Sequence, residues 1–307
     1  MPQDRPTTST AEPLATLVDR RAALLARSGD ADDQVRAQLD EATAELTDAL
    51  AGAAPVVRPV TLADDPALLD VLVEREPVVP FAEGDARRVD LEHRLGPDRR
   101  CFALEHPLLP GRLMNVVWVA LCVGRPAELA PLLDPAANPI DPGEADTAAF
   151  YSIWNVEPGL VGIPGGRSLL KGVISELRDE LPGLHDFLTL SPVPGFRRWL
   201  ADAATPGSDG ELLAAAARYL TTLDGDGRPI DPVARFHLGN GARLLHLNAD
   251  ADRSPRGLDR SLGVMANYHY EPEDRAANRA ELAAARPAVG PQVRALLEQG
   301  FGPDIQG

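Results

Sequence analysis

Apolar residues recur at helical spacing near the start of the chain. One stripe consists of Leu14, Leu17, Val18, Leu24 and Leu25, and a second consists of Val35, Leu39, Ala42, Leu46 and Leu50. Residues three and four apart share one face of a helix, so the pattern predicts two amphipathic helices. A short break at 28–30 favours an antiparallel hairpin, with a linker at 51–59. We expect this hairpin to pack on the main body or on another subunit.

Strand-like and helix-like patterns alternate beyond residue 60. Short apolar runs predict strands at 101–104, 115–123, 150–156, 186–190, 242–247 and 262–270. Helical spacing predicts helices at 65–74, 167–181, 196–203, 211–223, 275–285 and 292–299. The mixture predicts an α+β fold, a mixed central sheet flanked by helices. We divide the chain into a disordered tail at 1–13, the helical hairpin and linker at 14–59, and a main domain at 60–307.

Composition narrows the partners and the compartment. The net charge is -16, which disfavours nucleic acid and anionic membranes. It would also repel any other polyanion unless basic residues gather at the binding site. No apolar run approaches the roughly 18–20 residues of a membrane span. The polar start lacks the apolar core of a secretory signal, and Cys101 and Cys122 are the only cysteines, so we expect a reducing, cytoplasmic setting. No histidine or cysteine cluster has zinc spacing, and we expect no metal.

A turn rich in glycine and proline joins a predicted strand to a predicted helix. It contains Val161, Gly162, Ile163, Pro164, Gly165, Gly166, Arg167 and Ser168. A turn that enters a helix exposes backbone N–H groups, and the helix dipole adds positive potential, so a pyrophosphate fits there. Arg167 would add a charge-assisted contact. The turn is neither a P-loop nor a GxGxxG fingerprint, and from these residues alone a turn without a ligand is the stronger interpretation.

A serine and a histidine occupy two further notable positions. Ser191 follows a predicted strand and precedes Pro192 and Pro194, which stiffen the turn at the sheet edge. It has no GxSxG elbow, so acyl-enzyme chemistry of the hydrolase kind is not indicated. His237 lies among apolar residues, just ahead of a Gly-Asn-Gly turn. Taken singly, such residues are usually structural.

Their contexts resemble one protein family, malonyl-CoA decarboxylase. The most specific motifs are Leu-Ser-Pro-x-Pro-Gly-Phe at 190–196 and Asp-Pro-Val-Ala-x-Phe-His-Leu-x-Asn-Gly-Ala at 231–242. Segments at 96–102, 248–257 and 263–268 also resemble the family, and all the matching segments stand in the family's order. The resemblance extends over roughly 60–300. Two long motifs in series make coincidence very improbable.

The resemblance implies a fold and a reaction. The fold would be similar to that of Gcn5-related N-acetyltransferases, preceded by a helical domain of which the hairpin is a remnant. The turn at 161–168 would grip the CoA pyrophosphate, and Ser191 and His237 would be the catalytic pair. The implied reaction converts malonyl-CoA, or a substituted malonyl thioester, to acetyl-CoA or its homologue and CO2. No cofactor is implied beyond the CoA of the substrate.

The chemistry of a malonyl thioester agrees with this set of residues. The thioester carbonyl is itself the electron sink, so the site must orient the carboxylate, stabilise the enolate and protonate carbon. Ser191 can hydrogen-bond the carboxylate or relay a proton, and His237 can deliver it, since imidazole titrates near neutral pH. Backbone N–H groups at 162–166 are candidate enolate donors. We expect Asn267 and Tyr268 to line the pocket, and Asn240 either to orient His237 or to build the turn.

Three other functions compete with this one. A CoA-dependent N-acyltransferase of the same fold would need a base and an open acceptor channel. A decarboxylase could instead act on a malonyl or methylmalonyl group that is carried by an acyl carrier protein in a biosynthetic pathway. A non-catalytic acyl-CoA sensor is disfavoured by the intact serine and histidine. The N-terminal helices could also support a homo-oligomer.

Overall fold

The computed structural model describes residues 13–27, 33–163, 166–200 and 206–299. The expected tail, apart from Pro13, and the break at 28–30 lie outside these ranges. Contacts group the chain into two compact units. The first comprises 1–58, 103–116 and 155–172, and the second comprises 59–102, 117–154 and 173–307. The expected division at residue 59 stays a prediction.

The helical hairpin forms as predicted, in the first unit. Its helices are α1 (Leu14–Arg27) and α2 (Asp33–Leu50), and each buries its apolar stripe. The linker expected at 51–59 is wrong in part, because β1 (Val56–Val60) begins there. Its valines favour extended backbone, and β1 is the first strand in the sheet order, an edge position where Pro59 is tolerated.

One mixed sheet contains all the strands found in the described part of the chain. After β1 come β2 (Arg99–Glu105), β3 (Leu113–Cys122), β4 (Thr147–Asn155), β5 (Asp186–Thr189), β6 (Ser191–Pro192), β7 (Arg243–Asn248) and β8 (Met265–His269). Their order is β1-β2-β3-β4-β5-β8-β6, and β7 also pairs with β8. β4 and β5 are parallel, whereas β8 runs antiparallel to β5, β6 and β7. The predicted α+β class with a mixed sheet is confirmed.

The chain changes its pairing partner at Leu190. Phe150 of β4 is in register with Thr189 of β5, and the Leu190 N–H donates to the Phe150 carbonyl at 3.1 Å. The next residue, Ser191, pairs instead with Ala266 of β8. Ser191 therefore lies where the chain stops pairing with β4 and begins to pair with β8. Its strand, β6, is the last in the sheet order, which agrees with the predicted edge position.

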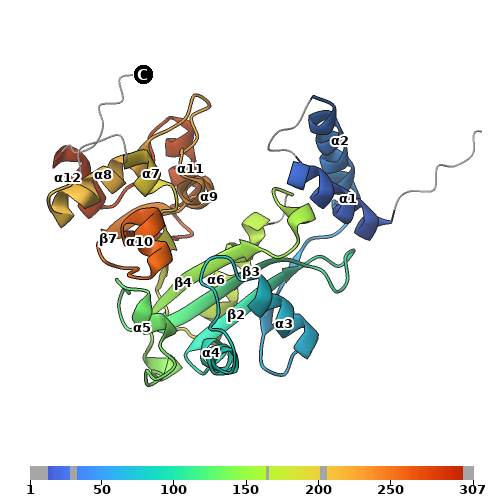
Figure 1. Ribbon diagram of the computed structural model, residues 1–307, viewed down its shortest axis with the longest axis horizontal. Coiled ribbons are helices and arrows are strands. Elements are labelled where there is room, and N and C mark those ends of the chain that lie inside the picture. Colours follow the sequence, from blue (N-terminus) through green and yellow to red (C-terminus); the bar gives the residue numbers. More distant parts are fainter. Residues whose placement is uncertain (1–12, 28–32, 164–165, 201–205, 300–307) are drawn as a thin grey trace, which may run out of the picture. The chain divides into compact units, whose positions relative to one another are not determined.

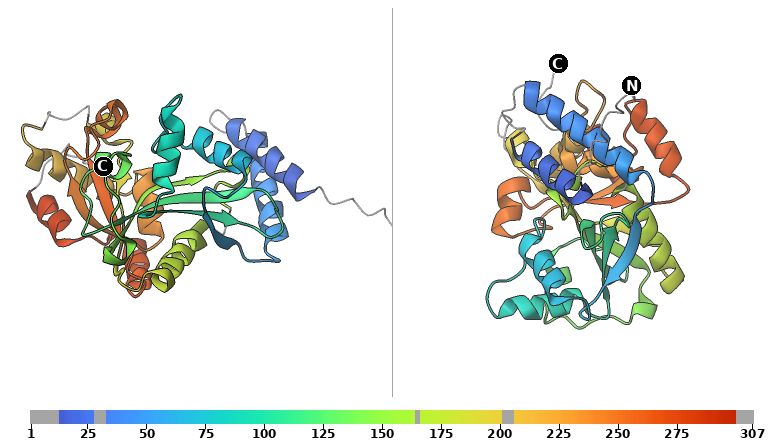
Figure 2. Two further views of the ribbon diagram at one scale, coloured as in Figure 1. Left: turned by 90° about the horizontal axis from the view of Figure 1, so that it is seen from below. Right: turned by 90° about the vertical axis from the view of Figure 1, so that its right-hand side faces the viewer.

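Helices cover both faces of the sheet. In the second unit, α3 (Pro66–Arg75) and α4 (Ala86–Arg94) lie over one face, and the last turns of α6 (Gly166–Glu180) lie over the other (Figure 2). Around β7 and β8 gather α7 (Phe196–Leu200), α8 (Asp209–Thr221), α9 (Pro232–Gly239), α11 (Arg275–Ala283) and α12 (Pro291–Gln299) (Figure 1). The predicted helix at 196–203 continues into residues outside the described part.

Several short elements were not predicted. They are α4, α5 (Ala130–Leu133), α9, α10 (Pro255–Ser261), β6 and the 3-10 turns at Pro142–Glu144 and Pro158–Leu160. Each is too short, or too interrupted by glycine and proline, to show a clear period. Among the described helices, none combines the length and apolar character needed to cross a membrane.

Candidate active site

His237 is positioned by a short helix. Asp231 caps α9, since its Oδ1 accepts the backbone N–H groups of Val233 and Ala234 at 2.9 and 2.8 Å. Pro232 follows at the first helical position, which suits its fixed φ. His237 falls in the last turn and is only 3% exposed. The motif at 231–242 thus contains a short capped helix ahead of the predicted turn.

The structure brings Ser191 and His237 together. The Ser191 Oγ lies 3.1 Å from the His237 Nε2, and both side chains are buried. Ser191 comes from β6 and His237 from α9, 46 positions later in the sequence. The β6–β8 pairing and the packing of α9 on β7 place both residues in the second unit.

Two tyrosines complete the surroundings of the imidazole. The Tyr270 hydroxyl lies 2.7 Å from the His237 Nδ1, so both ring nitrogens have hydrogen-bond partners. The Tyr268 ring stacks on the imidazole, with centroids 4.5 Å apart. Sequence reasoning missed Tyr270. Strand alternation was a signal that could have found it, because residues two apart lie on the same face.

Thr189 is the second residue that sequence reasoning missed. Its Oγ1 lies 2.9 Å from the Ser191 Oγ and accepts the Tyr268 backbone N–H at 3.1 Å. The Thr189 side chain is fully buried. A relay of hydrogen-bonding groups therefore runs from Thr189 through Ser191 and His237 to Tyr270. Thr189 also stands two residues from Ser191, so the same alternation would have indicated it.

The asparagines support the site from behind. Asn267 is fully buried; its Nδ2 donates to the Thr189 carbonyl at 2.8 Å and its Oδ1 accepts from Asn248. Asn240 ends α9 through its backbone, whose N–H donates to the His237 carbonyl at 3.1 Å. Since other groups hold both ring nitrogens of His237, the geometry agrees with a turn-building role for Asn240. Asn267 and Tyr268 are both fully buried and support the pair, and their place in the lining of a substrate pocket stays a prediction.

Burial sets the charge state of this cluster. Desolvation lowers the pKa of His237 to about 3 and raises the pKa of Tyr270 well above its ordinary range. Both side chains are therefore neutral at physiological pH in the free protein. The expectation that His237 titrates near neutral pH is wrong, because that value belongs to a solvated imidazole.

The glycine-rich turn lies in the first unit. Val161 is exposed, Gly162 is exposed with φ +76°, and Ile163 is buried. Pro164 and Gly165 lie outside the described residues, as do the side chains of Arg167 and Ser168. Gly166 opens α6, so the turn does enter a helix as predicted.

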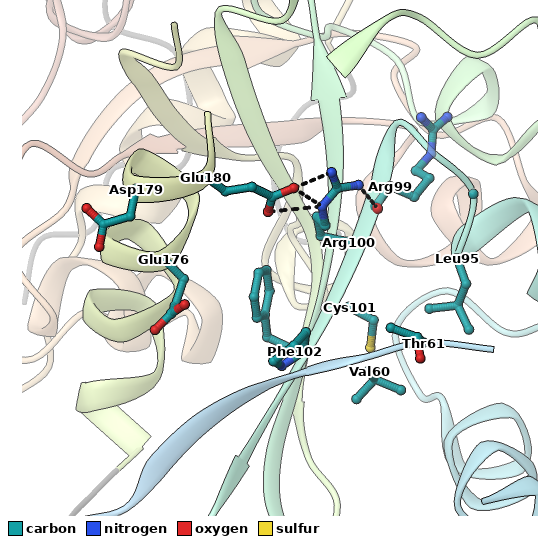
Figure 3. A pocket seen from close by; sticks show the side chains of 12 residues that line it. Val60, Thr61, Leu95, Arg99, Arg100, Cys101, Phe102, Glu176, Asp179 and Glu180 are labelled. Carbon is teal, nitrogen blue, oxygen red and sulfur yellow. Dashed lines mark hydrogen bonds and ion pairs between the residues drawn. The ribbon is translucent and has the colours of Figure 1, made fainter. Parts of the chain in front are cut away.

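A separate cavity of about 520 Å³ lies in the second unit (Figure 3). Arg100 there is paired with Glu180 at 2.5 Å, and Glu176 and Asp179 project from the same face of α6. Neither Ser191 nor His237 lines this cavity. Its acidic lining suits a polyanion such as CoA poorly. Among the described residues, no His/Cys/Asp/Glu cluster could hold a metal ion.

A mixed sheet with a buried serine–histidine pair at a strand divergence, and a glycine-rich turn that enters a helix, agrees with the fold that the motifs implied. Comparison with known proteins makes this specific. The model of the malonyl-CoA decarboxylase C-terminal domain matches residues 56–224 and 204–300. The chain belongs to the malonyl-CoA decarboxylase family, as its motifs indicated.

Individual relatives agree with this assignment. The mitochondrial malonyl-CoA decarboxylase of Anser anser anser is 32% identical to this chain, and that of Mus musculus is 30% identical. Each match covers 62% of this chain, and it covers 48% of the Anser protein and 49% of the Mus protein. The crystal structure of malonyl-CoA decarboxylase from Rhodopseudomonas palustris matches with a TM-score of 0.82 and 37% identity, covering 92% of this chain and 75% of that one. The enzyme from Agrobacterium vitis gives 0.82 and 37%, covering 94% and 77%. The chain spans about half the length of the goose and mouse relatives.

Proposed function

We propose that this protein decarboxylates malonyl-CoA, or a substituted malonyl thioester, to the shortened acyl-CoA and CO2. The observation that carries the proposal is the buried hydrogen bond between Ser191 and His237, at 3.1 Å. The motifs that contain these two residues lie within the family match. The CoA diphosphate would bind at the turn 161–168. No further cofactor is required, because the thioester carbonyl accepts the electron pair.

The relay supports a specific role for each group. The Tyr270 phenol stays protonated, and its one described acceptor is the His237 Nδ1. When Tyr270 donates there, Nε2 carries the proton that faces Ser191. The pair then acts as a proton donor, the opposite of a triad in which a carboxylate accepts from Nδ1. Ser191 holds the substrate carboxylate or passes the proton on.

The proposed reaction balances without a charged imidazole. The bond between the α-carbon and the carboxylate breaks, CO2 leaves, and the electron pair forms the enolate. Ser191 protonates the α-carbon and takes a proton from His237 Nε2, while Tyr270 protonates Nδ1. A solvent proton replaces the one that Tyr270 gives up, in step with the other transfers, so that no group of the relay is left charged. Such a positioned acid contributes roughly 10²–10⁴-fold to the rate.

An assay with malonyl-CoA alone tests the proposal. We expect acetyl-CoA and CO2 to form, with activity lost in Ser191→Ala and in His237→Ala and kept in His185→Gln, whose histidine is exposed. Turnover only after an amine is added would identify an acyltransferase and overturn the proposal. Turnover only on a carrier-protein thioester would exclude free CoA as the carrier. Parallel assays with methylmalonyl-CoA define the acyl group.

The setting and assembly remain part of the proposal. We place the reaction in the cytoplasm because two cysteines in 307 residues suit a reducing compartment. A homo-oligomer through the N-terminal helices would place further copies against the exposed faces of α1 and α2. Mass measurement of the intact protein and of a chain lacking residues 1–50 distinguishes that assembly from a monomer.

A further inference from the structure

A buried arginine in the first unit has no carboxylate partner among the residues that the structure describes. Arg21 of α1 is 4% exposed, and burial lowers its pKa. Its Nε donates to the Thr43 Oγ1 at 2.9 Å and its Nη1 donates to the Gly159 carbonyl at 2.7 Å. Within the described residues, no carboxylate pairs with Arg21, and its Nη2 has no acceptor. Since a guanidinium stays charged and an uncompensated buried charge is costly, this arrangement suits an anionic ligand.

The segment that Arg21 contacts is held firmly against α1. A Cβ added to Gly159 would lie 2.0 Å from the Val18 carbonyl oxygen, so only glycine permits this approach. Arg112 binds Asp19 of α1 through both terminal nitrogens, at 2.7 and 3.0 Å, and reaches Glu157 at 3.4 Å. The hairpin thus fixes the backbone that leads into the glycine-rich turn.

The free side of the guanidinium faces the start of that turn. The Arg21 Nη2 lies 4.0 Å from the position that a Cβ of Gly162 would occupy. Gly162 is exposed and has φ +76°, a conformation that glycine adopts without strain. The absence of a side chain at Gly162 leaves the approach to Arg21 open on this side.

We propose that Arg21 is a phosphate-binding residue for the CoA diphosphate. Nη1 holds the Gly159 carbonyl, and Nη2 donates to a phosphate oxygen beside Gly162. The inference rests on the proposed function in that the ligand is a CoA thioester. A buried guanidinium would also help a chain of net charge -16 to bind a polyanion. Its attraction for a phosphate is screened less by salt than that of a surface charge. The N-terminal hairpin then has a part in substrate binding.

Calorimetry with CoA, 4′-phosphopantetheine and pantetheine tests this role without requiring turnover. Arg21→Gln removes the charge but keeps a donor for Gly159, and Arg21→Lys keeps the charge. Because a hydrogen bond to a charged group is lost, we expect Arg21→Gln to weaken CoA binding about 10- to 100-fold. Arg21→Lys should retain most of the affinity. Pantetheine, which has no phosphate, should bind all variants equally. The control is Arg20→Gln, since Arg20 is on the same helix and pairs with Glu45 at the surface.

Two results would overturn the role of Arg21. One is an equal loss of affinity for CoA and pantetheine, and the other is an Arg21→Lys variant as weak as Arg21→Gln. Either would mean that Arg21 only supports the turn. Unliganded melting temperatures show whether each variant is folded. A protein that binds CoA through Arg21 but leaves malonyl-CoA intact contradicts the proposed function alone. One that decarboxylates malonyl-CoA with an unchanged KM in Arg21→Gln contradicts the role of Arg21 alone.

Discussion

The ring of Tyr268 lies stacked on the imidazole of His237, with 4.5 Å between centroids and 23° between planes. Its hydroxyl is buried and has no hydrogen-bond partner among the described residues. Tyr270 differs, because its hydroxyl reaches the His237 Nδ1 while its ring lies edge-on at 6.0 Å. One tyrosine therefore acts on the histidine through its ring and the other through its hydroxyl, which makes them a matched pair for substitution.

Removal of the Tyr268 hydroxyl should be harmless. Tyr268→Phe keeps the stacked ring and removes a buried polar atom without a described partner. We expect kcat within about twofold of the wild type and a free energy of unfolding that is equal or higher by about 1 kcal/mol. Urea unfolding and steady-state assays with malonyl-CoA measure both. A tenfold loss of kcat would show instead that this hydroxyl takes part in the reaction.

Removal of the Tyr270 hydroxyl should slow the reaction. Tyr270→Phe leaves the His237 Nδ1 without its partner, so the tautomer with a proton on Nε2 loses its support. We expect kcat to fall roughly 10- to 100-fold, with KM within threefold, because a proton relay acts in the chemical step. Tyr268→Phe is the control. A higher KM at unchanged kcat would indicate that Tyr270 binds substrate and does not position His237.

Sequence reasoning found the two ends of the hydrogen bond but not its supports. Ser191 and His237 were indicated by long motifs, and the strands around them by apolar runs. Thr189 and Tyr270 were missed because their roles depend on the register between β5 and β8, which joins residues about 80 positions apart. Strand alternation places Thr189 on the same face as Ser191 and Tyr270 on the same face as Tyr268. Local patterns do not say, however, which strands pair with each other in the sheet.

The helix that carries His237 illustrates a second limit. α9 has eight residues, and Pro232 and the glycines at 239 and 241 interrupt any apolar period. Only the Asp-Pro start indicates a helix, and that dipeptide also begins turns. The charge state of His237 was equally out of reach, because burial by α9 and β8 determines it. Local sequence thus indicated the residue, while tertiary packing set its pKa.

Stability should fall in mild acid because of His237. Its pKa is about 3 in the folded protein and about 6.5 in an unfolded chain, so the unfolded state binds more protons between these values. Above pH 6.5 the imidazole is neutral in both states and does not change the free energy of unfolding. As the pH falls from 6.5 toward 3, protonation of the unfolded state lowers that free energy progressively. At pH 5 it amounts to roughly 2 kcal/mol. Urea unfolding at pH 7.5 and 5.0 measures the loss.

The control for this pH effect is His237→Gln, which titrates nothing at that position. Its loss of stability between pH 7.5 and 5.0 should be smaller than that of the wild type by the same amount. The remaining titrating groups contribute equally to the wild type and to His237→Gln, so their effects cancel when the two losses of stability are subtracted. Equal losses would contradict the low pKa and mean that the imidazole is solvated.

The cap at Asp231 should affect both stability and activity. Asp231→Ala removes the acceptor for two backbone N–H groups, which costs about 1–2 kcal/mol at a helix start. Because α9 has little more than two turns, loosening its start should also displace His237, and we expect kcat to fall about tenfold. Asp231→Asn keeps the Oδ1 acceptor and serves as the control, with smaller losses of both. Urea unfolding and malonyl-CoA turnover are measured on the three proteins. A variant that loses stability but keeps its full kcat would show that Tyr268 and Tyr270 alone hold the imidazole in place.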